Sequence, residues 1–183
     1  MGAFLHGSLC AVFFTAGLCG AAEAASHAKD PAKETVLIGV TAVESGTPNE
    51  MVIKLELEPA KAMTTLHQGS WMDMGVKAGE PYHYEVKPED PKSKTRIAFA
   101  RVLVSVLNRD NGRKIEGELH PMWGGSGLHY AMNGPLPGDG AYRATVTIEP
   151  PTFARDVKER ERWTKAVTAT FNFRVRGGMI VAE

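Results

Sequence analysis

Hydrophobic and polar residues alternate along several stretches of the chain, which predicts that it folds mainly into β-strands. The alternation is clearest at residues 51–58, where Ile53, Leu55 and Leu57 interleave with charged residues. A period of two is expected for a strand that turns one face toward a core. Similar patterns predict six further strands, at residues 35–43, 82–86, 96–108, 113–120, 141–148 and 165–176.

The segments between these strands carry turn signals and little sign of helix. Asn111-Gly112 is a strong hairpin signal, so residues 113–120 are expected to return antiparallel to the strand before them. The charged run at 156–162 is expected to be a surface loop or a short helix. Six to eight strands with turn signals favour an antiparallel β-sandwich.

Two stretches interrupt the strand pattern. Residues 59–79 are rich in Met and Gly and are expected to be irregular. Pro88 and Pro91 are expected to break the chain after the strand at 82–86.

The first 24 residues have the composition of a secretory signal rather than of a retained anchor. They contain no Lys or Arg, an apolar core runs from about residue 9 to 18, and Ala22-Glu23-Ala24 fits a small-x-small cleavage site. The apolar run is too short to span a bilayer well. We therefore expect residues 1–24 to be a signal peptide and residues 25–183 to form a single domain in an extracytoplasmic compartment.

Composition excludes several functions for the remaining 25–183 segment. Both cysteines lie in residues 1–24, so no disulfide and no thiolate ligand is expected, and a blue-copper site is excluded. The segment keeps all 21 basic residues and loses only one of the 21 acidic ones, and this balance argues against nucleic-acid binding. It contains no apolar run that could cross a membrane.

Met122 and His129 stand on either side of a glycine-rich loop, between two strand-like segments. Soft thioether sulfur prefers cuprous copper, and imidazole suits copper, iron and zinc. The alternative is that Met122 fills a gap in the core and that His129 is a hydrogen-bonded structural residue.

His83 and Glu85 form a second candidate pair. Residues two apart on a strand point to the same face, so an imidazole and a carboxylate would lie side by side. The carboxylate could bind a metal or orient a histidine that does. The alternative is an ordinary polar surface.

Motifs for nucleophilic catalysis, phosphate binding and zinc proteolysis are absent from the sequence. These absences favour a binding protein over an enzyme.

Taken together, these residues resemble a family of periplasmic iron-transport proteins that bind copper and work beside a high-affinity iron permease. The resemblance covers about residues 55–173 and is strongest at 121–163. The matching motifs are Pro121-Met122, His129-Tyr130, Gly138-Asp139-Gly140-Ala141-Tyr142-Arg143, Ile148-Glu149-Pro150-Pro151, Trp163 and His83-x-Glu85.

The resemblance implies both a fold and a site. The fold would be an immunoglobulin-like β-sandwich, usually a homodimer with the metal site near the dimer interface. By the resemblance, His83, Met122 and His129 are copper ligands, and Glu85 is a ligand or a close neighbour. Iron is a second candidate metal.

The sequence departs from the family pattern in two places. The family usually has a histidine shortly after Ile-Glu-Pro-Pro, but residues 152–158 contain none. Family members often carry an acid, implicated in a second metal position, where Ser126 stands here. Glu85 could fill the vacancy left by the histidine. Further substitutes are His120, His67 and Asp156.

The leading hypothesis is a periplasmic copper-binding protein that assists iron uptake through an inner-membrane permease. One alternative is a β-sandwich interaction module without a metal, which the two departures favour. Another is a weak enzyme of the ferroxidase type.

Overall fold

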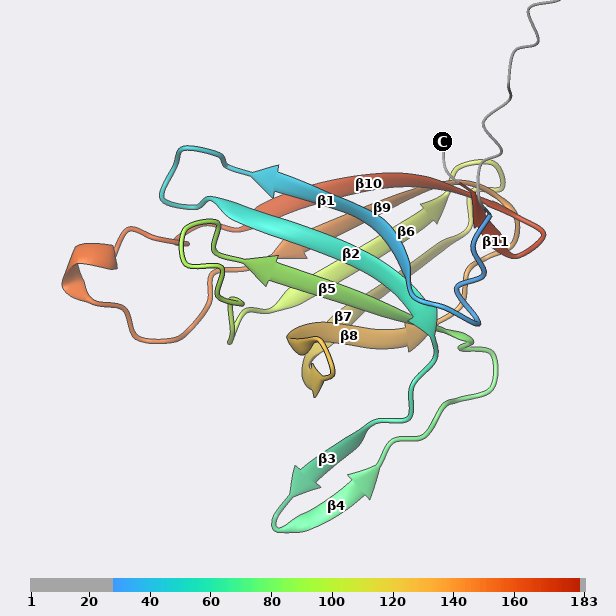
Figure 1. Cartoon of the computed structure of the whole chain (residues 1–183), viewed down its shortest axis with the longest axis horizontal. Coiled ribbons are helices and arrows are strands. Elements are labelled where there is room, and N and C mark those ends of the chain that lie inside the picture. Colours follow the sequence, from blue (N-terminus) through green and yellow to red (C-terminus); the bar gives the residue numbers. More distant parts are fainter. Residues whose placement is uncertain (1–27, 182–183) are drawn as a thin grey trace, which may run out of the picture.

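The computed structural model describes residues 28–181, and over this range the protein is built almost entirely from β-strands (Figure 1). The expected signal peptide at 1–24 lies outside the described residues. The strands are β1 (Val36–Val43), β2 (Met51–Pro59), β3 (Thr64–His67), β4 (Ser70–Asp73), β5 (Tyr82–Glu89), β6 (Val102–Asn108), β7 (Lys114–Gly124), β8 (Gly127–Gly134), β9 (Gly140–Ile148), β10 (Val167–Arg176) and β11 (Met179–Val181). One 3-10 turn, η1 (Val157–Glu159), falls in the charged run.

Nine strands form one continuous antiparallel sheet in the order β1-β2-β5-β8-β7-β6-β9-β10-β11. Strand β7 joins its two halves. Its first part pairs with β6 up to Leu119, and its second part pairs with β8 from His120 onward. The sheet folds over so that the β1-β2-β5 half covers the β6-β9-β10 half (Figure 1). The predicted immunoglobulin-like β-sandwich is confirmed.

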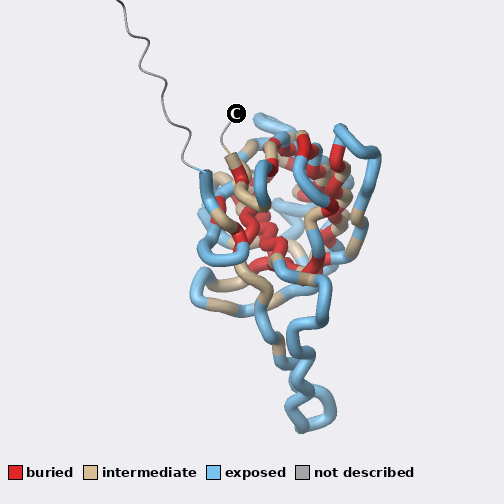
Figure 2. The backbone as a smooth tube through the Cα atoms, turned by 90° about the vertical axis from the view of Figure 1, so that its right-hand side faces the viewer, coloured by how far each residue is buried: buried red, intermediate tan, exposed pale blue. Residues whose placement is uncertain are grey.

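The core lies between the two halves and is filled by alternate residues of each strand. Ile53, Leu55 and Leu57 of β2 are at most 1% exposed, as their spacing predicted. On the facing half, Tyr142 and Phe173 stack with their ring centroids 5.0 Å apart. Figure 2 shows the buried residues gathered inside the body and a long exposed arm projecting from it. Within residues 28–181, no helix has the length and apolarity to span a bilayer.

The exposed arm is the β3–β4 hairpin, which replaces the irregular stretch expected at 59–79. Its eight strand residues are all exposed. A hairpin with no buried face needs no alternation of hydrophobic and polar residues, so periodicity could not predict these two strands.

The expected break at Pro88 is wrong, because Pro88 lies inside β5 and is paired with Ile53 of β2. Its carbonyl points away from β2 and accepts a hydrogen bond from the backbone of Ile97. In a strand, the N–H of a residue lies on the same side as its carbonyl, so the N–H that Pro88 lacks would face the side of β8. The pairing of β5 with β8 ends before Pro88, at Val86. Proline is tolerated there because no ladder hydrogen bond is lost.

The strand expected at 96–108 begins only at Val102. Phe99 has φ 54°, in the left-handed region, which interrupts an extended chain. The buried hydroxyl of Tyr130 holds this segment, accepting from the backbone of Ala100 and donating to the carbonyl of Ile97, each at 3.0 Å. The predicted hairpin at Asn111-Gly112 is confirmed, since β6 and β7 pair antiparallel across it.

Candidate metal site

Strand β5 carries the first two site residues on the face opposite the core. Tyr84 and Val86 point into the core, so His83 and Glu85 point outward between them. They are nevertheless buried, with 0% and 3% of their surface exposed. The two-residue spacing therefore correctly predicted that the imidazole and the carboxylate share a face. Because this face is buried, it is not the ordinary polar surface considered as the alternative.

The β7–β8 hairpin brings the third residue to the same place. His129 is the direct cross-strand partner of Met122, so their side chains share a face. The glycine-rich loop is a tight turn in which Gly125 and Ser126 separate the strands. A Cβ on Gly124 would lie 3.0 Å from Cε1 of His129, so the absence of a side chain there gives the imidazole its room.

Both histidines are held in the same tautomer. Nδ1 of His83 lies 2.8 Å from Oδ1 of Asn133, and Nδ1 of His129 lies 2.9 Å from the carbonyl oxygen of Gly127. Both oxygens only accept, so each Nδ1 carries the hydrogen and each Nε2 presents a bare lone pair. Neither buried Nε2 has a hydrogen-bond partner.

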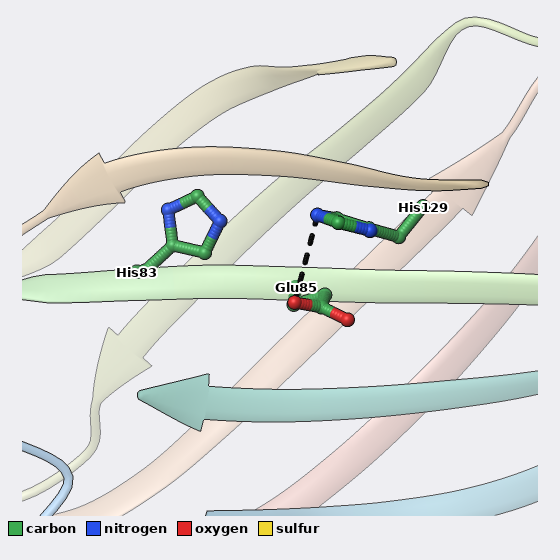
Figure 3. A group of neighbouring side chains, drawn as sticks. All are labelled: His83, Glu85 and His129. Atoms are coloured by element: carbon green, nitrogen blue, oxygen red, sulfur yellow. Dashed lines mark ion pairs between the residues drawn. The ribbon is translucent and has the colours of Figure 1, made fainter. Parts of the chain in front are cut away.

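Glu85 lies beside these two nitrogens (Figure 3). Its Oε2 is 3.6 Å from Nε2 of His129, and ligand atoms of His83, Glu85 and His129 all lie within 4.8 Å of one another. Two ligands of one ion with bonds of about 2.1 Å lie at most about 4.2 Å apart, so a small contraction would close this set around a single ion.

The carboxylate of Glu85 is kept ionised by its surroundings. Burial alone would raise its pKa, but the neighbouring side chains, among them Lys87 and Ser126 as hydrogen-bond donors, outweigh burial and lower the pKa to about 2. Oε1 accepts from the hydroxyl of Ser126 at 2.8 Å and from Nζ of Lys87 at 2.5 Å. Oε2 is left facing the histidines, with Lys61 at 3.9 Å.

Burial lowers the pKa of His83 below its ordinary value, and the hydrogen bond with Asn133 only partly offsets this effect. The neutral imidazole is the form that binds a metal. Its surroundings therefore favour the metal-binding form at neutral pH.

The model of the family described as Fe2+ transport protein matches residues 92–177. The resemblance to the iron-transport family is confirmed. The matched segment includes the β7–β8 hairpin with Met122 and His129, whereas His83 and Glu85 precede it.

Curated relatives match less than half of this chain. UPF0423 proteins of Brucella abortus and Brucella suis are 30% identical over 86 residues, covering 42% of this chain and 47% of the relative. The chain thus spans about half the length of the curated relatives that it matches.

Solved structures of two bacterial proteins, FetP and P19, share the fold. FetP of uropathogenic Escherichia coli strain F11 aligns with a TM-score of 0.62 at 22% identity, covering 82% of this chain and 99% of that one. Copper-reconstituted P19 of Campylobacter jejuni aligns with a TM-score of 0.62 at 19% identity, covering 81% and 99%. A copper-bound FetP variant gives 0.61 at 24% identity, covering 79% and 99%.

The two departures from the iron-transport pattern have visible structural consequences. Ser126, at the position of the family acid, donates a hydrogen bond to Glu85. Asp156 caps η1 by accepting a hydrogen bond from the backbone of Lys158. It does not belong to the group of His83, Glu85 and His129, the only such cluster of possible metal ligands found in residues 28–181. His120 and His67 are also absent from that group and are exposed. Glu85 is therefore the only one of the four suggested substitutes that lies with the two histidines.

Sequence reasoning missed Asn133 and Lys87, which position the site without belonging to its motifs. Asn133 follows His129 by four residues on β8 and shares its face. The shared face of His129 and Asn133 could have been predicted if a strand had been assigned after the glycine-rich turn. Lys87 continues the alternation of His83 and Glu85 on β5.

Proposed function

We propose that the protein binds copper through Nε2 of His83, Nε2 of His129, a carboxylate oxygen of Glu85 and the thioether of Met122. The observation that carries this proposal is the pair of buried, unpartnered Nε2 atoms that face a buried carboxylate. A buried polar atom without a partner is costly, and a bound cation would remove that cost at both histidines.

The donor set suits copper better than its competitors. Two imidazoles and a carboxylate would also bind Zn²⁺, but Cu²⁺ binds a given nitrogen and oxygen site more tightly. The thioether of Met122 adds a soft ligand that favours Cu⁺. FetP and P19, which share the fold, have been crystallised with copper, and this supports the assignment. The family description makes iron a second candidate.

We further propose that the protein works in the periplasm and assists iron uptake through an inner-membrane iron permease. The family description, Fe2+ transport protein, and the signal-like residues 1–24 support this role. We propose a homodimer, as the family resemblance implies, and a binding protein rather than an enzyme.

The test is a copper titration of the mature chain, residues 25–183, in competition with a chelator. His83→Ala and His129→Ala are expected to weaken Cu²⁺ binding by about 100-fold or more, because each removes a ligand from the ion. His67→Ala is the matched control, since His67 lies on the exposed hairpin away from the site. Wild-type binding no tighter than micromolar would refute the copper proposal.

One observation favours the second candidate, an interaction module without a metal. Lys87 and Ser126 already bind Oε1 of Glu85, so part of the site is neutralised by the chain itself. The same titration separates the two functions. A ferroxidase, the third candidate, would consume oxygen when ferrous iron is added, and no uptake is expected.

A further inference from the structure

An open pocket of about 1270 Å³ lies between the stem of the β3–β4 hairpin and the end of β7. Its walls include Met63 and Met74 at the hairpin stem, and His120 and Met122 on β7. The proposed copper site uses only Met122 of these four residues. The other three soft or imidazole side chains have no role in that site.

Met63 and Met74 face each other across the stem. The register of β3 with β4 pairs Thr64 with Asp73, and its continuation pairs Met63 with Met74. The backbone N–H of Met74 donates to the carbonyl of Met63 at 2.7 Å, which shows that the pairing does continue. Residues paired across antiparallel strands share a face, so the two thioethers lie on the same side.

A side-chain contact is consistent with this shared face. The hydroxyl of Thr65 donates to Sδ of Met74 at 3.7 Å. Thr65 is two residues from Met63 and therefore shares its face. The sulfur of Met74 thus lies over the face that Met63 occupies.

The opposite wall carries the other two donors. His120 and Met122 are two residues apart on β7 and share a face. Met122 is also the cross-strand partner of His129, so the pocket borders the imidazole–carboxylate site.

These methionines differ from those that fill the core. Met51 is fully buried in the core, whereas Met74 is 44% exposed and His120 is exposed. Packing in the core therefore does not account for the side chains of Met74 and His120. The charged residues that line it are Asp73, Glu80 and Glu118 against Lys77, an excess of acid that favours a cation.

We propose that this pocket is a second metal site, for a soft monovalent cation such as Cu⁺, with Met63, Met74 and His120 as ligands and Met122 shared with the first site. Thioethers and imidazole suit Cu⁺, whereas a harder divalent ion would prefer carboxylate, carbonyl or water oxygens over the thioethers. The inference rests on the proposed function only through the shared Met122.

Silver ion, a redox-inert probe with the preferences of Cu⁺, tests the pocket on the mature chain. The double variant Met63→Leu/Met74→Leu is expected to weaken Ag⁺ binding by about tenfold or more while leaving Cu²⁺ binding within about twofold. Met179→Leu is the control, because Met179 lies on β11 and does not line the pocket. His129→Ala should show the reverse pattern, with Cu²⁺ binding lost and Ag⁺ binding kept.

Methyl NMR of the wild-type protein gives a readout that does not depend on the variants folding. Ag⁺ should shift the methionine methyl signals of Met63 and Met74 and leave those of Met51 and Met179 unchanged. Equal Ag⁺ affinity of the double variant and Met179→Leu, or unshifted Met63 and Met74 signals, would overturn the pocket site. Retention of Cu²⁺ binding by His129→Ala would instead overturn the first site, so the two failures are distinguishable.

Discussion

Asn133 offers a sharp test of the metal site, because it touches a proposed ligand without being one. Its Oδ1 fixes the tautomer of His83, and its amide also contacts the backbone of Lys61, accepting from N at 3.3 Å and donating to O at 2.8 Å. If the bare Nε2 of His83 binds the metal, removing Asn133 should weaken binding even though every ligand remains.

The expected sizes follow from these contacts. Asn133→Ala removes three hydrogen bonds of a side chain that is 9% exposed. At about 0.5–1.5 kcal/mol for each bond, the free energy of unfolding should fall by about 1.5–4.5 kcal/mol. Loss of ligand orientation should cost about 10–100-fold in copper affinity, or about 1.4–2.7 kcal/mol.

Asn133→Asp separates the tautomer from general loss of structure. Its carboxylate has nearly the same shape and can still accept from Nδ1 of His83, so copper affinity should stay within about threefold of the wild-type value. Asn172→Ala, at an exposed position of β10, is the control for the loss of an amide. Affinities are measured by chelator competition, and stabilities by urea unfolding of the metal-free variants. Equal loss of affinity in Asn133→Ala and Asn133→Asp would refute the tautomer argument, as would no loss in either.

Three further predictions concern pH, charge and backbone. Copper affinity should fall as pH drops below about 6.5, the ordinary histidine pKa. Because the pKa of His83 is lowered, this residue should become protonated, and copper affinity should be lost, at a more acidic pH. Lys87→Met should lower the stability of the metal-free protein by about 3–5 kcal/mol, because it leaves two buried glutamates without their shared cation. Gly140→Ala should be more destabilising than Gly46→Ala: both positions have positive φ, but only at Gly140 would a Cβ lie 2.5 Å from Oδ1 of buried Asn108.

Each of these predictions has a direct check. Chelator competition at pH 7.5 and pH 5 would contradict histidine ligation if the affinities were equal. The histidine effect on folding has the same sign, since a lowered folded pKa gives stability that is present above pH 6.5 and is lost as pH falls through the folded pKa. Thermal unfolding of Lys87→Met without loss of stability would show that its ion pairs contribute nothing. Equal melting temperatures for the two glycine variants would exclude the contact with Asn108.

The local alternation of hydrophobic and polar residues was enough to predict most strands of the sandwich. At β9 and β10, one face is buried and the other is more exposed, so a period of two appears in the sequence and locates each strand to within a residue or two. Local pattern fails where burial does not alternate. The β3–β4 hairpin has no buried face, and β5 is buried on both faces. Periodicity therefore could not predict where these strands begin and end.

The candidate site divides in the same way. The shared face of His83 and Glu85 is a local property of β5 and could be read from their spacing. Their meeting with His129 depends on the pairing of β5 with β8, between residues more than forty positions apart, and nothing local signals it. Here the family resemblance supplied what the pattern could not.

The same geometry explains how the site can lack the family's third histidine and still remain organised. With an acid in place of Ser126, a second anion would stand near Glu85 and would need a cation between them. Ser126 is instead a neutral donor, and together with Lys87 it engages Oε1 and leaves Oε2 toward both bare imidazole nitrogens. Because Glu85 stays ionised down to a pKa of about 2, it offers a metal a fixed negative charge and has no proton to release at neutral pH. Ser126 and Lys87 thus hold Glu85 in an orientation that suits the binding of a cation beside the two imidazoles.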